Sequence, residues 1–161
     1  MCIRDRSSSR IRDALSLGEF DLAEQLLGRP YFIMGRVVYG RQLGRQLGVP
    51  TANIRLQRYR AALEGVFAVT VMGLDREFEG IANIGARPTV DGKEPLLEVH
   101  IFDFDEDIYG RLLTVTFLKK VRDERTFDGL ESLKKQIEQD IAETRDWFAI
   151  GRPEPRREGI L

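Results

Sequence analysis

Three residues have the types and spacing best suited to chemistry. Glu98 lies within an otherwise apolar run, where a carboxylate either faces solvent or serves a role that offsets its burial. Thr51 and Asn53 stand two positions apart, so an extended backbone places both side chains on the same side. Mg²⁺ prefers oxygen ligands and usually keeps waters and substrate phosphates, so two neutral ligands suffice when a nucleotide brings the charge. These residues point toward a metal-dependent reaction on a nucleotide.

A segment rich in glycine and arginine leads into Thr51. The residues from Gly35 to Gly48 could hold a polyanion between main-chain N–H groups and guanidinium groups. The segment contains neither G-x-x-x-x-G-K-[ST] nor G-x-G-x-x-G, so it is neither of the two common nucleotide-binding fingerprints. A glycine-rich hairpin followed by a capped turn is the alternative, and these residues alone leave it open.

Two further polar stretches could contact a ligand. Asn83–Thr89 follows a strand pattern and combines an amide, a glycine and an arginine before a proline, which predicts a shaped loop. Arg122–Asp128 places cations, carboxylates and a ring at the start of a helix, where a flat polar ligand could bind. The alternatives are a polar connection and a solvated charged turn.

Two other patterns are interpreted as structural. Asp103, Asp105 and Asp107 resemble the opening of a calcium loop, but Ile108 and Thr114 stand where an EF-hand needs glycine and glutamate. His100 shares a strand face with Glu98, and a lone histidine in a strand is more often structural than a ligand.

Composition limits the class of protein. The 161 residues are 42% hydrophobic, which suits one sizeable domain. Lys+Arg at 25 against Asp+Glu at 26 gives a formal charge of -1, so nothing calls for a nucleic-acid partner or an anionic membrane. With a single cysteine, Cys2, no internal disulfide can form. No apolar run approaches the roughly 20 residues needed to span a bilayer, and no secretory signal is visible. A cytoplasmic protein without membrane contact is expected.

Apolar periodicity predicts the elements that must position these residues. Helices are expected at 10–17 and 19–27, strands at 31–39, 65–72, 78–84, 96–102 and 112–121, and a long final helix from Asp128. Five or six strands without interleaved helices favour an antiparallel barrel, with the final helix lying across it. Two prolines and many charges after Phe148 predict a disordered tail.

Taken together, the motifs resemble one family. They are Leu27-Gly28-Arg29-Pro30-Tyr31, Gly44-Arg45-Gln46-Leu47-Gly48-Val49-Pro50-Thr51-Ala52-Asn53, Asn83-Ile84-Gly85-Ala86-Arg87-Pro88-Thr89, Leu97-Glu98-Val99-His100, Tyr109-Gly110, Arg122-Asp123-Glu124 and Phe127-Asp128. From about Ser7 to about Thr144 the chain resembles the riboflavin kinase module of the bacterial bifunctional riboflavin kinase/FMN adenylyltransferases. The resemblance implies a mainly β fold, a six-stranded antiparallel Greek-key barrel with a C-terminal helix and short N-terminal helices.

The resemblance also implies a reaction and its residues. The γ-phosphate of ATP passes to the 5′-hydroxyl of riboflavin, giving FMN and ADP, with Thr51 and Asn53 as Mg²⁺ ligands and Glu98 as the catalytic base. The implied ATP-binding residues are Gly35, Arg36, Val37, Gly40, Arg41, Gly44, Arg45, Gly48, Pro50, Thr51 and Asn53. The implied flavin-binding residues are Asn83, Arg87, Glu98, Arg122, Glu124 and Phe127.

The chain departs from the family at its start. The bifunctional proteins carry an adenylyltransferase domain ahead of the kinase, and only residues 8–12 resemble the end of that domain. The expected division is a lead-in at 1–28 that is mobile or docks loosely, a barrel domain with its C-terminal helix at 29–148 and a tail at 149–161. A flavin-binding or RNA-binding barrel without catalysis is the alternative function, and the oligomeric state is left open.

Overall fold

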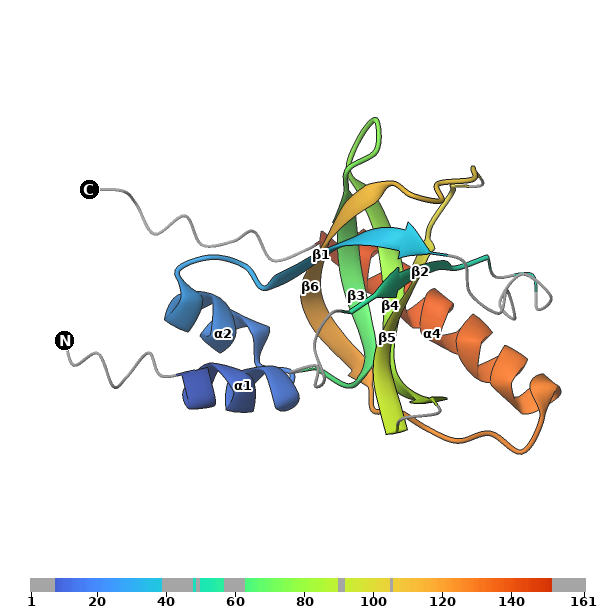
Figure 1. Ribbon diagram of the computed structural model, residues 1–161, viewed down its shortest axis with the longest axis horizontal. Coiled ribbons are helices and arrows are strands. Elements are labelled where there is room, and N and C mark those ends of the chain that lie inside the picture. The colour runs from blue at the N-terminus through green and yellow to red at the C-terminus, as the bar shows by residue number, and fades with distance from the viewer. Residues whose placement is uncertain are drawn as a thin grey trace. The chain divides into compact units, whose positions relative to one another are not determined.

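The computed structural model describes residues 8–38, 48, 50–56, 63–89, 92–104 and 106–151. The chain forms two compact units, Met1–Thr126 and Phe127–Leu161. The first unit contains two helices and the strands, and the second contains the final helix (Figure 1). The described elements are α1 (Ser8–Ser16), α2 (Phe20–Leu27), β1 (Phe32–Val38), β2 (Ala52–Arg55), β3 (Gly65–Met72), β4 (Phe78–Thr89), β5 (Gly92–Ile101), β6 (Leu112–Arg122) and α4 (Leu130–Gly151).

The strands form a closed barrel in the order β1-β2-β5-β4-β3-β6. Every neighbouring pair is antiparallel. Strands β3, β4 and β5 follow one another directly, while β2 lies beside β5 and β6 lies beside β3. Each of these returns completes a Greek-key arrangement. The predicted six-stranded antiparallel Greek-key barrel is confirmed.

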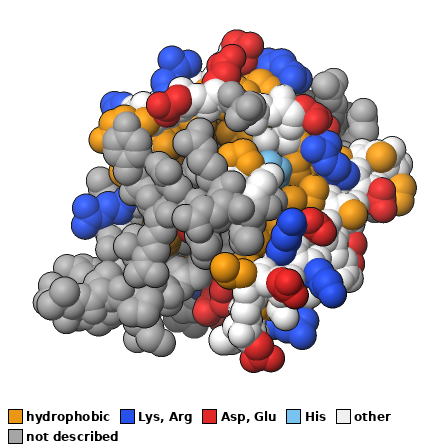
Figure 2. Space-filling view, turned by 90° about the vertical axis from the view of Figure 1, so that its right-hand side faces the viewer, with side chains coloured by type: hydrophobic (Ala, Val, Ile, Leu, Met, Phe, Trp, Pro, Cys, Tyr) orange, Lys and Arg blue, Asp and Glu red, His pale blue; other side chains and the backbone are white. Residues whose placement is uncertain are grey.

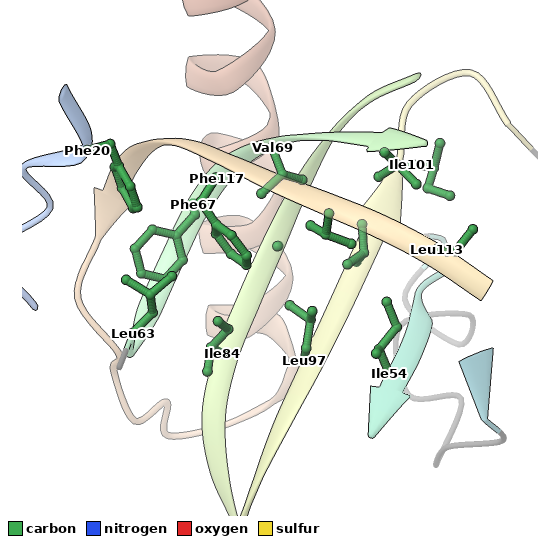
Figure 3. Close-up of a cluster of buried hydrophobic side chains, with 14 of the residues drawn as sticks. Phe20, Ile54, Leu63, Phe67, Val69, Ile84, Leu97, Ile101, Leu113 and Phe117 are labelled. Atoms are coloured by element: carbon green, nitrogen blue, oxygen red, sulfur yellow. The ribbon is translucent and has the colours of Figure 1, made fainter. Parts of the chain in front are cut away.

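Alternating side chains separate the inside of the barrel from its outer face. On β5, Leu97, Val99 and Ile101 are buried in the hydrophobic core. Figure 3 shows Leu97 and Ile101 among the inward side chains contributed by the other strands. Because successive residues of a strand point to opposite faces, Glu98 and His100 lie on the outer face. The predicted alternation of β5 is confirmed.

Helices α1 and α2 complete the core of the first unit. Phe20 of α2 packs edge-to-face on Phe67, with ring centroids 5.7 Å apart, and stacks on Phe117 at 6.4 Å (Figure 3). Ala14, Leu15, Phe20 and Ala23 all belong to the buried core cluster. The loose docking expected for this lead-in is therefore wrong, because its apolar face is buried against the aromatic rings of β3 and β6.

The second half of β4 differs from the sequence prediction. Residues 83–89, predicted as a loop, pair with β5 from Asn83↔Glu98 to Thr89↔Gly92. The pairing of β4 with β3 ends at Gly65↔Ile84, so, among the residues that the structure describes, 85–89 pair with β5 alone. Glycine and proline are tolerated in such a segment because it has one unpaired edge. The residues that suggested a loop instead form a two-stranded ribbon with β5.

Helix α4 forms the second unit, and its predicted existence is confirmed. The backbone N–H of Leu133 donates to the Gly129 carbonyl at the start of the helix. Gln136 donates to Asp140, and Gln139 donates to Glu143, each one helical turn further along. The helix continues to Gly151, so the prediction of a disordered tail is wrong for residues 149–151, and the rest of that tail, 152–161, lies outside the described residues. Its position across the barrel stays a prediction.

Among the described residues, the helices are too short or too polar to span a lipid bilayer.

Candidate active site

A single row of residues on the outer face joins five strands of the barrel. Glu98 on β5 pairs directly with Asn53 on β2 and with Asn83 on β4. Asn83 in turn pairs with Val66 on β3, and Val66 pairs with Arg122 on β6. Side chains directly opposite one another in an antiparallel pair have Cβ atoms about 4.5–5.5 Å apart. These five residues, called the outer row below, therefore bring the candidate base Glu98 next to two side-chain amides.

The position of the outer row follows from the core. Ile54, Leu97 and Ile84, each one residue beyond a member of the row, are fully buried inside the barrel. Asn53 is also only 5% exposed, although it lies on the outer face. The Asn53 amide is therefore shielded from water next to Glu98.

Asn83 carries an unused hydrogen-bonding atom. Its Oδ1 is buried and has no hydrogen-bond partner, and it is the only such side-chain atom among the described residues. Buried polar atoms in native proteins nearly always have a hydrogen-bond partner. A buried polar atom without one costs about 1–3 kcal/mol of stability. The atom therefore calls for a donor, which an O–H or N–H of a ligand beside Glu98 would supply.

Glu124 adds a second carboxylate near the outer row. Partial burial raises the pKa of Glu124, the Arg122 guanidinium lowers it, and the charges of Glu64 and Glu98 raise it again. The net shift of the Glu124 pKa is upward, chiefly because burial disfavours the charged carboxylate, and the nearby charges of Glu64 and Glu98 add to it. Gly85 leaves room for this carboxylate, because a Cβ there would lie 3.1 Å from Glu124 Oε2.

The segment that carries Thr51 is fixed from β5. Thr51 directly precedes β2, so continuing the alternation of that strand places it on the same face as Asn53. His100 Nδ1 lies 2.8 Å from the carbonyl oxygen of Pro50. Among the described residues, no group of three or more His, Cys, Asp or Glu side chains could hold a metal. The side-chain oxygens of Thr51 and Asn53 are uncharged and of the type that Mg²⁺ accepts when phosphate oxygens supply the charge.

Comparison with known proteins decides the family. A family model described as flavokinase, riboflavin kinase, matches residues 27–148. The chain belongs to the flavokinase family.

The curated relatives extend well beyond the flavokinase region. A bifunctional riboflavin kinase/FMN adenylyltransferase from Pseudomonas fluorescens is 50% identical over 153 residues, which cover 94% of this chain and 48% of that protein. The protein of the same name from Escherichia coli K12 is 47% identical over 148 residues and is covered to 47%. The chain therefore spans about half the length of the curated relatives it matches.

Two solved structures share the flavokinase barrel. The riboflavin kinase of Trypanosoma brucei superposes with a TM-score of 0.53 at 25% identity, covering 74% of this chain and 78% of that one. A Streptococcus pneumoniae structure that carries the name macrolide-efflux protein superposes with a TM-score of 0.78 at 39% identity, covering 88% of this chain and 47% of that one.

The glycine- and arginine-rich segment from Gly35 to Gly48, expected to bind ATP, is described only at its two ends. Gly40, Arg41, Gly44 and Arg45 lie outside the described residues. Val37 is buried in the core, its backbone N–H donates to the Arg111 carbonyl, and its carbonyl accepts from the Gly110 N–H. A Cβ at Gly35 would lie 2.6 Å from Ile54 Cγ2, so this glycine is needed for packing inside the barrel. Arg36 donates from Nη1 to the Gly110 carbonyl at 3.1 Å, which ties β1 to the turn before β6.

The expected flavin-binding residues lie on β4, β5, β6 and the segment that follows β6. Asn83, Glu98 and Arg122 share the outer row, and Glu124 lies near it. Arg87 pairs with Glu94 on the ribbon, further along β4, and only its backbone is described. Phe127 opens the second compact unit.

Sequence reasoning missed the carboxylate of Glu64 and the hydrogen bond of His100. The strand pattern of 96–102 already placed His100 beside Glu98, but its partner Pro50 is 50 residues away in sequence. Glu64 precedes β3 and belongs to no motif. Its charge raises the pKa of Glu124 because the pairing of β3 with β6 brings the two residues near each other.

Proposed function

We propose that this chain is a riboflavin kinase that transfers the γ-phosphate of ATP to the 5′-hydroxyl of riboflavin, giving FMN and ADP. Membership of the flavokinase family supports the reaction class. The observation that carries the proposal is the outer row, where Glu98 lies between the amides of Asn53 and Asn83. A passive flavin carrier has no need for a carboxylate between two fixed amides.

Glu98 is the catalytic base in this proposal. It accepts the proton of the riboflavin 5′-hydroxyl while that oxygen forms a bond to the γ-phosphorus and the bond from phosphorus to the leaving ADP oxygen breaks. Such a reaction requires little covalent work from the protein, so positioning supplies much of the rate enhancement. The ladders on both sides of β5 hold Glu98 at a fixed place for this role.

Thr51 and Asn53 are the residues that would hold Mg²⁺. The ion, when bound with ATP, neutralises charge on the phosphates. Both side chains are uncharged, and Asn53 is nearly fully buried, so the site is shaped before any ligand arrives. The affinity for the ion comes mainly from the nucleotide that it accompanies.

The remaining polar groups of the outer row bind the flavin in this proposal. Asn83 Oδ1 accepts a hydrogen bond from the flavin, which removes its unpaired state. Arg122 and Glu124 contribute a cation and a carboxylate to the same region, and the glycine- and arginine-rich segment contributes to nucleotide binding. Arg36 donates one hydrogen bond to the Gly110 carbonyl. A guanidinium has five N–H groups, so others are left to contact a nucleotide phosphate.

The names of the relatives suggest a second activity in the same polypeptide. They are named for FMN adenylyl transfer as well as riboflavin phosphorylation, and this chain matches about half of their length. We infer that the chain corresponds to the kinase part, which is normally linked to an adenylyltransferase domain. Before residue 28, the described part of the chain contains the two short helices α1 and α2.

Incubation of the chain with riboflavin, ATP and Mg²⁺, followed by chromatography, tests the proposal. FMN and ADP should appear in equal amounts. Binding of riboflavin without FMN would instead identify a non-catalytic flavin-binding barrel. A parallel incubation with FMN, ATP and Mg²⁺ should give neither FAD nor pyrophosphate, and formation of FAD would reveal a second active site in these 161 residues.

A further inference from the structure

We propose that His100 is a positioning residue, which orients the peptide between Pro50 and Thr51 and thereby the metal-binding side chain of Thr51. The inference rests on the proposed role of Thr51 in binding Mg²⁺ with a nucleotide. It concerns how the site is held in shape, because His100 acts on the Pro50 carbonyl and not on a substrate.

The hydrogen bond from His100 fixes the direction of one peptide plane. Nδ1 lies 2.8 Å from the Pro50 carbonyl oxygen, and a carbonyl can only accept. The Pro50 carbonyl and the Thr51 N–H belong to the same planar peptide group. Holding the oxygen therefore restricts the backbone directly before Thr51, and the ring must carry its proton on Nδ1.

The bond appears where backbone pairing can no longer hold the segment. The described pairing of β2 with β5 ends at Ala52↔Val99, so Thr51 and Pro50 lie beyond the ladder. Pro50 has no N–H and cannot donate to a further backbone bond. The side chain of His100 continues the connection between the two chain segments past this point.

The imidazole itself is well supported. It packs edge-to-face against Phe102, with ring centroids 5.7 Å apart, and His100 pairs with the buried Ile81 across β4. His100 is partly exposed, and the face drawn in Figure 2 shows the histidine colour beside hydrophobic side chains. Glu98 lies two residues earlier on the same face of β5. One strand thus carries both the proposed base and the residue that fixes the proposed metal-binding segment.

A comparison of the wild type, His100→Phe and His100→Asn distinguishes the contribution of the hydrogen-bond donor from that of the aromatic ring. Phenylalanine keeps a ring beside Phe102 but has no donor, whereas the asparagine amide nitrogen can occupy a place close to that of Nδ1. ADP binding is measured by calorimetry with and without Mg²⁺, and riboflavin binding is measured by fluorescence.

We expect His100→Phe to lose roughly 5–10-fold of the Mg²⁺-dependent gain in ADP affinity, the usual effect of one net hydrogen bond. ADP affinity without Mg²⁺ and riboflavin affinity should stay unchanged, and His100→Asn should keep most of the gain. A His100→Phe protein with the full Mg²⁺-dependent gain would overturn the proposal, as would equal losses with and without Mg²⁺.

The wild-type protein gives a second measurement that needs no variant. His100 is the only histidine in the chain, so the two ring nitrogens can be assigned without ambiguity in ¹⁵N spectra. The neutral ring should carry its proton on Nδ1, and a ring protonated on Nε2 alone would contradict the hydrogen bond. Failure of the proposed kinase function would be recognised by different results. The wild-type protein would then form no FMN and would show no Mg²⁺-dependent binding of ADP.

Discussion

Asn53 on β2 and Glu98 on β5 are direct partners in an antiparallel ladder. The proposed metal ligand and the proposed base are therefore separated by one strand spacing and held by backbone hydrogen bonds on rigid elements. Glu98 has Asn83 as its partner on the opposite side. A site built on paired strands keeps its geometry better than one assembled from loops.

Replacement of Glu98 by glutamine should preserve riboflavin binding and lower kcat about 10²–10⁴-fold, because a positioned general base is lost while the shape is kept. Glu79→Gln is the control, since Glu79 is an exposed carboxylate on β4 outside the outer row. Stopped assays of FMN formation and fluorescence titration of riboflavin give the two quantities. Wild-type turnover by the Glu98→Gln protein would remove this residue from the mechanism.

Mg²⁺ should bind weakly to the ligand-free protein and well only together with ADP or ATP, because Thr51 and Asn53 bring no charge. Thr51→Val keeps the shape and removes the oxygen, so it should weaken Mg²⁺-dependent nucleotide binding and leave riboflavin binding unchanged. Calorimetry measures both. Tight binding of Mg²⁺ to the protein alone would show that other, charged ligands hold the ion.

Gly85→Ala should weaken riboflavin binding roughly tenfold, equivalent to about 1.4 kcal/mol. The added Cβ would lie 3.1 Å from Glu124 Oε2 and would push this carboxylate out of place. Gly129→Ala is a matched control, because a Cβ there meets nothing within 4 Å. In the double variant with Glu124→Ala, the glycine replacement should have no further effect. Additive losses would show that Gly85 acts independently of Glu124.

Glu124→Gln should change how stability depends on pH. The folded protein has a raised pKa at this group relative to the value of 4.5, so it binds the proton more tightly than the unfolded chain does. The wild type therefore loses free energy of unfolding as the pH rises from the unfolded pKa through the folded pKa. The variant should melt at a higher temperature than the wild type at neutral pH and lose this advantage below the unfolded pKa. Thermal melts across this range check the sign, and an advantage found only in acid would contradict it.

Phe20→Ala should lower the free energy of unfolding by about 3–5 kcal/mol, the usual cost of removing a buried aromatic ring. Phe20 contacts the rings of both Phe67 and Phe117, so its loss leaves a cavity at one end of the core. Leu17→Ala is the control, because Leu17 is 70% exposed and should change stability by less than about 0.5 kcal/mol. Urea unfolding provides the comparison. A small effect of Phe20→Ala would mean that the lead-in helices contribute little to the fold.

The fold was largely accessible from apolar periodicity. The strand at 65–72 was predicted with its observed bounds, and Leu97, Val99 and Ile101 were assigned to one face because alternation is a local property. Residues 85–89 were misread because Gly85 and Pro88 usually indicate a turn, whereas here they lie in a segment with one unpaired edge. The packing of Phe20 could not be predicted, since its partners on β3 and β6 are set by tertiary structure.

The candidate site was accessible as residue types but not as an arrangement. Thr51, Asn53 and Glu98 were selected for their oxygen atoms, yet nothing local shows that Asn53 and Asn83 flank Glu98, because strand register depends on the whole barrel. The hydrogen bond from His100 to Pro50 likewise joins residues far apart in sequence. The room that Gly85 leaves for Glu124 depends on the same long-range pairing.

The ribbon formed by the ends of β4 and β5 affects whether another chain can add a strand to the barrel. A closed barrel offers no exposed strand edge to which another chain can add, but residues 85–89 of β4 continue past the end of β3 and, within the described part of the chain, pair on one side only. Gly85 and Pro88 lie on this segment, where a missing side chain and a missing N–H make a poor template for an incoming strand. The same residues that suggested a loop thus discourage edge-to-edge aggregation along the edge of residues 85–89.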